Sequence, residues 1–256
     1  MKSISNNNTY PQVCLAAAED DNIFDRFKTI PQYTEILEHT APETGAGYLE
    51  VIKRDNPQLL EDKYITKFKE NDIYGGSSKH LYQDIEIAPS TLRYIKVLSD
   101  LIKFFGNLDG FKIAEVGGGY GGQCKIINDF FKIESYHIVD LPDVNKLSKK
   151  YLDKLNVKNV RFSSVEDLVI AKYDLFISNY AYSELDSNLQ DIYKTNIIDT
   201  SKNGYMTCNF ISDIFMNPSE FYSREKLIGL KDKVEIHNEE PLTHPNNFIL
   251  TWKNTP

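Results

Sequence analysis

The stretch that most constrains this chain is residues 112–123, which read KIAEVGGGYGGQ. A short apolar run enters five glycines, and apolar residues then recur at helical spacing, which is the pattern of a strand, a tight turn and a helix. Gly117, Gly119 and Gly122 hold the G-x-G-x-x-G spacing. Glycine is required where the backbone takes a positive φ or approaches a ligand closely. The stretch therefore predicts an α/β sheet with a ligand on this turn.

Two classes of cofactor use such a turn. Enzymes that bind dinucleotides place the pyrophosphate on the helix N-terminus, where free N–H groups and the helix dipole favour anions. Enzymes that bind S-adenosylmethionine, which has no phosphate, typically carry an acid two positions before the first glycine, and Glu115 stands there. A carboxylate at that position suits the ammonium and sulfonium of the methyl donor better than a diphosphate. The expected donor contacts in the turn are Glu115, Gly117, Gly118, Gly119, Tyr120 and Gln123.

A second acid supports a nucleotide-like ligand. Residues 135–140 form another short strand pattern, and Asp140 ends it 21 residues after Gly119. At this position an open α/β sheet holds the carboxylate that binds the ribose hydroxyls. We therefore expect Asp140, with Leu141 directly after it, at the ribose end of the ligand. A plain cap at the end of the strand is the alternative for Asp140.

Residues 115–123 (EVGGGYGGQ) and 138–142 (IVDLP) resemble class I S-adenosylmethionine-dependent methyltransferases. More closely, they resemble the sugar O-methyltransferases found among bacterial surface-polysaccharide enzymes, as do residues 88–95 (APSTLRYI) and 247–252 (NFILTW). The resemblance covers roughly residues 70–253. It implies a Rossmann-like, doubly wound, seven-stranded sheet with an antiparallel edge hairpin, and methyl transfer from S-adenosylmethionine to a sugar hydroxyl.

The same resemblance predicts the adenine contact and the reacting end of the site. Class I methyltransferases hold a residue against the adenine in the segment that corresponds to residues 163–167, and the candidates here are Ser164, Val165 and Glu166. The next strand pattern, residues 173–178, lies across the switch point of a doubly wound sheet from the glycine strand. The residues after it therefore face the transferred group, and those with polar side chains are Asn179, Tyr180, Tyr182, Ser183 and Glu184.

Outside these motifs the chain divides into three parts. Residues 1–20 are polar, and we expect a flexible tail there. Residues 21–88 have a charged helical pattern without a cofactor motif, and we expect a helical segment that covers the substrate or makes a dimer contact. We expect residues 89–256 to form the S-adenosylmethionine-binding, Rossmann-like catalytic domain. Within the second part, residues 72–80 contain two glycines, as a lid or a linker would.

An amphipathic helix begins near residue 90 and is closed by Gly106. Arg93 lies in its first turn, where the helix dipole does not favour a cation. We expect Arg93 to bind the carboxylate of the methyl donor or an acidic group of the substrate. A surface salt bridge is the alternative.

Methyl transfer to a sugar requires a base, because a sugar hydroxyl is a very weak acid. A positioned base contributes roughly 10²- to 10⁴-fold in rate, and histidine is the usual choice because its pKa of about 6.5 lies near working pH. The candidates, in order of preference, are His244, His80, and then Glu184 or Tyr180. His244 comes first because the loop of residues 238–246 is expected to emerge at the rim of the glycine turn. His137 and His237 lie in or near strands and are expected to serve packing.

The composition limits the partners. The chain has 256 residues, enough for a substantial core, and 29 basic against 37 acidic residues give a net charge of −8. Because there is no long basic run, we expect neither nucleic acid nor membrane as a partner. We expect a sugar or nucleotide-sugar substrate, with a homodimer as an option. No run of 18 apolar residues occurs, so a cytoplasmic protein is expected.

Metal sites and disulfides are not predicted. The three cysteines are few and widely spaced, and Cys124 is expected to be a small packing residue. Asp213 and Glu184 are acids that a magnesium ion would use, but no compact acidic cluster surrounds them.

Three other interpretations stay open. A methyltransferase of this type acts in some cases on a phenol or a carboxylate instead of a sugar. A nicotinamide-dependent oxidoreductase would use the Y-x-x-x-K spacing at Tyr222 and Lys226, although more than 110 residues precede the glycine turn here. A non-catalytic relative of the fold would have lost the cofactor residues, whereas Glu115, Gly117, Gly119 and Asp140 are all present.

Overall fold

The computed structural model describes residues 9–209 and 221–253, and its centre is a seven-stranded sheet of order β5-β4-β3-β6-β7-β9-β8. The strands from β5 to β7 are parallel, whereas β9 is antiparallel to both β7 and β8. The strands are β3 (Lys112–Val116), β4 (Ser135–Val139), β5 (Val160–Ser163), β6 (Tyr173–Asn179), β7 (Ser201–Cys208), β8 (Glu235–Asn238) and β9 (Phe248–Lys253). The predicted Rossmann-like sheet with its antiparallel edge hairpin is confirmed.

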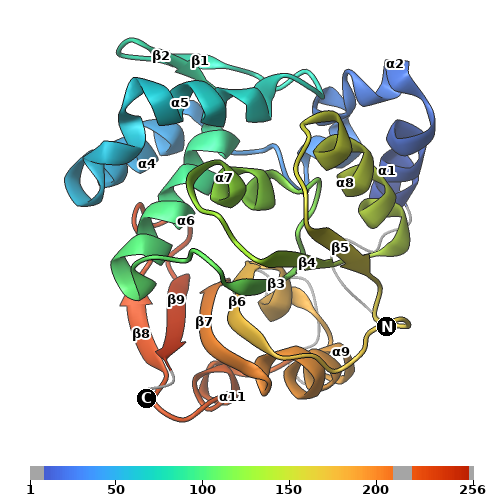
Figure 1. Ribbon diagram of the computed structural model, residues 1–256, viewed down its shortest axis with the longest axis vertical. Helices are drawn as coiled ribbons and strands as arrows, with labels where there is room; N and C mark the ends of the chain where they lie inside the picture. Colours follow the sequence, from blue (N-terminus) through green and yellow to red (C-terminus); the bar gives the residue numbers. More distant parts are fainter. Residues whose placement is uncertain (1–8, 210–220, 254–256) are drawn as a thin grey trace.

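Helices cover both faces of this sheet (Figure 1). One face carries α6 (Pro89–Phe105), α7 (Gly122–Phe130) and α8 (Pro142–Lys154). The other carries α9 (Ser187–Tyr193), the π-helical turn η5 (Lys194–Ile198) and α11 (Arg224–Ile228). Parallel strands covered on both faces have apolar side chains in succession, not in alternation. In β6 the consecutive residues Leu175, Phe176 and Ile177 are all fully buried.

The order of the strands fixes where a ligand can bind. β3 pairs with β4 on one side and with β6 on the other. The connection after β3 runs to β4, toward one edge of the sheet, and the connection after β6 runs to β7, toward the other edge. A crevice therefore opens beyond the carboxyl ends of β3 and β6. The glycine turn follows β3 directly and lies at this crevice.

The segment before α6 packs against the face that α6, α7 and α8 occupy. It contains α1 (Thr9–Glu19), α2 (Asp21–Phe24), η1 (Phe27–Thr29), α3 (Pro31–Thr34), α4 (Pro42–Asp55), η2 (Pro57–Leu60), α5 (Asp62–Phe68) and η3 (Lys69–Asp72). α1 packs against α8, and α4 packs against α6. None of the helices in the described ranges is both long and apolar enough to cross a bilayer.

The prediction of a flexible tail over residues 1–20 is wrong for Thr9–Glu19. Tyr10, Cys14 and Ala17 are buried on one side of α1. Their spacing of four and then three residues places them on one face of a helix. This apolar face packs on α8, so the segment belongs to the core.

Residues 80–87 form a small hairpin that the sequence pattern did not predict. β1 (His80–Tyr82) pairs with β2 (Ile85–Ile87) in a two-stranded sheet of its own. The Tyr82 hydroxyl donates a hydrogen bond to the Pro42 carbonyl at 3.1 Å, which ties the hairpin to the start of α4. Figure 1 shows the hairpin beside α5, on the far side of the helical layer from the large sheet.

Candidate functional site

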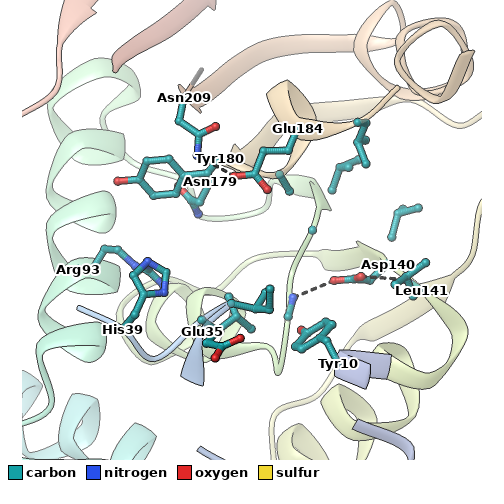
Figure 2. A pocket seen from close by; sticks show the side chains of 18 of the residues that line it. Tyr10, Glu35, His39, Arg93, Asp140, Leu141, Asn179, Tyr180, Glu184 and Asn209 are labelled. Atoms are coloured by element: carbon teal, nitrogen blue, oxygen red, sulfur yellow. Dashed lines mark hydrogen bonds between the residues drawn. The ribbon is translucent and has the colours of Figure 1, made fainter. Parts of the chain in front are cut away.

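A cavity of about 830 Å³ lies at the carboxyl ends of β3, β4 and β6. The turns after these strands line one side, and the segment from Glu35 to Tyr48 lines another. This is the position that the switch point of a doubly wound sheet provides for a ligand. Figure 2 shows labelled side chains from both parts of the chain around it.

The glycine turn forms the floor of the cavity. Gly117 and Gly119 both line it, with φ angles of +80° and +54°. A Cβ atom on Gly117 would lie 2.1 Å from the Cβ of Ala181, and one on Gly119 would lie 2.7 Å from Leu37 Cδ1. Backbone conformation and close packing therefore both require glycine at these positions.

Asp140, at the end of β4, is hydrogen-bonded to the glycine turn that follows the neighbouring strand β3. Its Oδ2 accepts a hydrogen bond from the Gly119 N–H at 2.9 Å, and its Oδ1 accepts one from the Leu141 N–H at 2.7 Å (Figure 2). Burial raises the pKa of this carboxyl to about 6. Asp140, Leu141, Ser164, Val165 and Glu166 all line the cavity, so the predicted ribose and adenine residues lie together.

Glu115 does not line this cavity, in contrast to the prediction that it contacts the donor. It is 1% exposed and its Oε2 accepts a hydrogen bond from the Tyr136 hydroxyl at 2.9 Å. Burial raises the pKa of Glu115 to about 8, because a charge inside the sheet would lose its hydration. Glu115 is therefore a neutral hydrogen-bonding group beneath the turn at pH 7.

Replacing Glu115 by Gln is expected to raise the melting temperature, by an amount that grows from pH 5 to pH 8. The folded protein keeps the Glu115 proton up to pH about 8, whereas the unfolded chain loses it near pH 4.3. Wild-type stability therefore falls as pH rises between these values. Gln is neutral throughout and lacks this loss. Calorimetric melting of both proteins over this range measures it; a difference that is constant with pH would show that Glu115 is ionised in the folded state.

Gly118, Tyr120 and Gln123 were also predicted to contact the donor, and none of them lines the cavity. A Cβ on Gly118 would meet Ile138 Cγ2 at 2.7 Å, so this glycine faces the neighbouring strand. Tyr120 is fully buried, and Gln123 Nε2 donates to the Tyr94 carbonyl at 3.2 Å. These side chains point into the core between α7 and the helices packed on it, because the turn directs them away from the crevice.

The residues after β6 form the opposite wall. Asn179, Tyr180 and Glu184 line the cavity, as predicted from the topology. Both side-chain polar atoms of Asn179 are buried with no hydrogen bond of 3.5 Å or less among the described residues, although the amide lies near enough to Glu115 to oppose the rise that burial causes in the pKa of that carboxyl. Tyr180 has a φ of +68°, a strained value for a tyrosine that persists only where the surroundings enforce it. Tyr182 and Ser183 are buried behind this wall and do not line the cavity.

The carboxyl group of Glu184 is buried and has one hydrogen-bond partner among the described residues, the side-chain amide of Asn209. Its Oε1 accepts a hydrogen bond from Asn209 Nδ2 at 2.7 Å. Burial raises the pKa of Glu184 above its ordinary value. The carboxyl group is thus available at the cavity wall as a hydrogen-bonding group.

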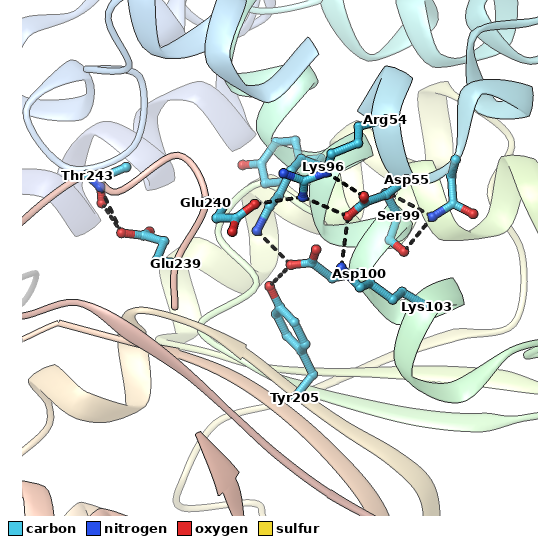
Figure 3. Close-up of polar contacts among 12 residues, drawn as sticks. Arg54, Asp55, Lys96, Ser99, Asp100, Lys103, Tyr205, Glu239, Glu240 and Thr243 are labelled. Atoms are coloured by element: carbon cyan, nitrogen blue, oxygen red, sulfur yellow. Dashed lines mark hydrogen bonds and ion pairs between the residues drawn. The ribbon is translucent and has the colours of Figure 1, made fainter. Parts of the chain in front are cut away.

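The loop between β8 and β9 brings His244 to the cavity. Glu239 accepts hydrogen bonds from Thr243 N at 2.9 Å and Thr243 Oγ1 at 2.7 Å, and the Tyr180 hydroxyl also donates to it (Figure 3). Arg54 of α4 pairs with Glu240 at 2.6 Å, which ties the same loop to the helical segment (Figure 3). His244 Nδ1 is buried and has no partner among the described residues. A ring nitrogen is therefore free to accept a hydrogen bond.

His80, the second predicted base, lies elsewhere. It is part of β1, where its Nε2 is 3.3 Å from the Ser78 hydroxyl, and it does not line the cavity. The two histidines that were expected to serve packing do so: His137 contacts Tyr173 and Ser163, and His237 contacts Thr251. The structure removes His80 from the candidates.

Several cavity residues were not identified from the sequence, and those in the N-terminal segment include Tyr10, Glu35, His39 and Tyr48. They come from α1, from the connection between α3 and α4, and from α4. No motif surrounds them, and only the apolar face of α1 indicated that this segment is docked. They reach the site because the segment folds over the end of the glycine turn.

Neither a metal cluster nor the dehydrogenase-type motif lies at this site. Within residues 9–209 and 221–253 no group of three or more His, Cys, Asp or Glu side chains could share a metal ion, and Asp213 falls outside these ranges. The Tyr222 hydroxyl donates to Asp191, and Lys226 Nζ lies 3.6 Å from the centre of the Tyr222 ring. Neither residue lines the cavity. Cys124 is fully buried, as a packing residue would be.

No family model and no curated protein matches this chain. Among solved structures it resembles an S-adenosylmethionine-dependent methyltransferase from Clostridium acetobutylicum, with a TM-score of 0.48 and 11% identity, over 62% of this chain and 89% of that one. It also resembles a methyltransferase of the same cofactor class from Aquifex aeolicus, with a TM-score of 0.45 and 14% identity, over 80% and 96% of the two chains. Such distant resemblances carry no argument about ligand or substrate, which must be inferred from the cavity itself.

Proposed function

We propose that this chain is an S-adenosylmethionine-dependent O-methyltransferase that acts on a sugar hydroxyl, in a nucleotide-activated sugar or a surface-polysaccharide precursor. One observation carries the proposal. A glycine turn, the carboxylate bound to it and unpaired amide groups meet in one cavity at the switch point of the sheet.

The residues at this cavity fit the methyl donor. Asp140 accepts from the glycine turn through Oδ2 and from the Leu141 N–H through Oδ1, and it still lines the cavity, where ribose hydroxyls would donate to its remaining lone pairs. Leu141, Ser164 and Val165 lie together at the cavity wall, where the adenine would pack against them. Asn179 Oδ1, a buried acceptor without a partner among the described residues, suits the ammonium of the amino-acid part. A dinucleotide has less support, since Tyr222 and Lys226 lie outside the cavity.

The other half of the cavity favours a polyhydroxylated acceptor. Asn209 Oδ1, Asn247 Oδ1 and His244 Nδ1 are buried hydrogen-bond acceptors without a partner among the described residues. Buried polar atoms are nearly always paired in folded proteins. Because their residues line the cavity, small rotations of these side chains would let sugar hydroxyls donate to these atoms, whereas an aromatic acceptor would leave most of them unsatisfied. This pattern supports a sugar over a phenol.

The bound donor supplies a methyl group on a sulfonium, which is already a good leaving group. The residues of this chain hold the acceptor hydroxyl in line, exclude water and remove a proton. We assign the proton to His244 Nδ1, which is unpaired and buried at the cavity wall. Glu239 positions the loop that carries His244 through its bonds to Thr243 and Tyr180. The helical segment would cover the substrate, because its residues Glu35, His39 and Tyr48 line the cavity.

The test is methyl transfer from S-adenosylmethionine with a labelled methyl group. The purified chain is incubated with a panel of nucleotide sugars, and with phenols and carboxylic acids as control acceptors. The proposal predicts label in a sugar methyl ether, which survives mild alkali, whereas a methyl ester would be hydrolysed. Label only in a phenol or an ester would reject the sugar assignment.

A further inference from the structure

Arg93 is a cation at the cavity wall that lacks a counter-ion within the described residues. It lies on α6 and lines the cavity, and none of the carboxylates in residues 9–209 and 221–253 comes within 4.0 Å of its guanidinium. Its Nε is buried without a hydrogen-bond partner there, and its guanidinium stacks on the Tyr94 ring at 5.3 Å. An arginine stays protonated in such a place. A partly buried positive charge of this kind is costly unless an anion binds to it.

The neighbouring carboxyl groups are engaged by other partners. Glu38 Oε2 accepts from the Ser90 hydroxyl at 2.7 Å, and Glu184 accepts from Asn209. Glu239 accepts from Tyr180 and Thr243. None of these three groups lies within 4.0 Å of the guanidinium. Burial raises the pKa of Glu38, although the charge of Arg93 opposes this rise, and Glu38 Oε1 has no partner among the described residues.

His39 lies beside Arg93 and faces the same space. Figure 2 shows the two side chains together, at the end of the cavity away from Asp140. Burial lowers the pKa of His39, and the charge of Arg93 lowers it further. His39 is thus a neutral imidazole next to a fixed cation. Its proton affinity would rise if an anion bound in the cavity beside both side chains.

We propose that Arg93 and His39 form an oxyanion subsite within the cavity, which binds a carboxylate or a phosphate. The guanidinium fork matches both groups with two parallel N–H bonds, and His39 would add a donor when the bound anion raises its proton affinity and the ring takes up a second proton. The inference rests on the proposed function for the identity of the ligand. Two sources supply the oxyanion: the methionine carboxylate of the donor, or an acidic group on the acceptor sugar, such as a uronic carboxylate or a sugar phosphate.

The test compares wild type, Arg93→Gln and Arg93→Lys by calorimetric titration. S-adenosylhomocysteine carries the methionine carboxylate, whereas 5′-methylthioadenosine lacks the amino-acid part. Glucuronate and inorganic phosphate are titrated into protein with and without S-adenosylhomocysteine, with uncharged glucose as the control. Melting of the ligand-free proteins checks folding, and Arg93→Gln is expected to melt no lower than wild type because it removes an unpaired charge.

A loss of at least about tenfold in S-adenosylhomocysteine affinity in Arg93→Gln, with 5′-methylthioadenosine affinity unchanged, would assign the subsite to the donor carboxylate. A similar loss of glucuronate or phosphate affinity, with both nucleosides unchanged, would assign it to the acceptor. Arg93→Lys, which keeps the charge and loses the fork, is expected to lie between. Equal affinities of wild type and Arg93→Gln for every anion would overturn the subsite. If wild type does not bind S-adenosylhomocysteine, the proposed function fails, and the glucuronate and phosphate titrations still decide the subsite.

Discussion

Replacing His244 by Ala is expected to lower kcat by about 10²- to 10⁴-fold, the usual contribution of a positioned base. His244 lines the cavity and its Nδ1 atom has no partner among the described residues, so the substitution removes the proposed base and disturbs no hydrogen bond of that atom there. The affinity for S-adenosylhomocysteine is expected to stay within about twofold. Steady-state rates with a saturating sugar acceptor, together with donor titration, provide the measurement.

His80→Ala is the matched control, because it removes the same side chain from the hairpin away from the cavity. It is expected to turn over at the wild-type rate. His39→Ala separates the two histidines of the cavity. Wild-type turnover in His244→Ala, with a large loss in His39→Ala, would transfer the role of base to His39.

Replacing Asp140 by Ala is expected to weaken binding of S-adenosylhomocysteine by about 10- to 150-fold. This range corresponds to the loss of hydrogen bonds to a charged group, at roughly 1.5–3 kcal/mol. The same change removes the carboxylate that accepts from the Gly119 and Leu141 N–H groups, so the glycine turn also loses an anchor. Calorimetric titration at pH 7.5, above the Asp140 pKa of about 6, measures the effect on the ionised form.

Asp143→Ala is the control for this substitution. Asp143 lies three residues further on, pairs with Lys146 at 2.9 Å and does not line the cavity. Its removal is expected to leave the affinity unchanged. An Asp140→Ala protein that binds S-adenosylhomocysteine as tightly as wild type would remove Asp140 from the ribose role and reduce it to a cap at the end of β4.

The sheet and its crevice were predictable because they follow from local patterns. The glycine turn fixes the end of β3, and Asp140 marks the end of β4. Once the doubly wound order is adopted, the residues after β6 must face the same crevice. Asp140, Asn179 and Glu184 were found in this way, and the structure brings all three to the cavity.

The role of Glu115 could not be predicted from the glycine motif alone, because it depends on how deeply β3 is buried. Both faces of β3 are covered by helices, so a side chain in it is buried in either direction. The acid beside the glycines was interpreted as a ligand group, yet its environment keeps it neutral. The buried position of Glu115 in β3 therefore determines its protonation state.

The residues that the N-terminal segment contributes to the cavity could not be predicted, for a different reason. Tyr10 and His39 reach the cavity through packing between segments that are far apart in sequence, and neither carries a local signal. Cys14 and Ala17, which dock α1, lie within a stretch that is polar on average. The periodicity of α1 was the available clue, and it indicates docking without indicating the site.

The methyltransferase assignment is tested most directly by calorimetric titration of the wild-type chain with S-adenosylhomocysteine, and in parallel with NAD⁺ and NADP⁺. We expect binding of S-adenosylhomocysteine alone, and a ligand at 100 times its Kd would stabilise the fold by about 2.7 kcal/mol in a melting experiment. Binding of a nicotinamide nucleotide without binding of S-adenosylhomocysteine would contradict the methyltransferase assignment.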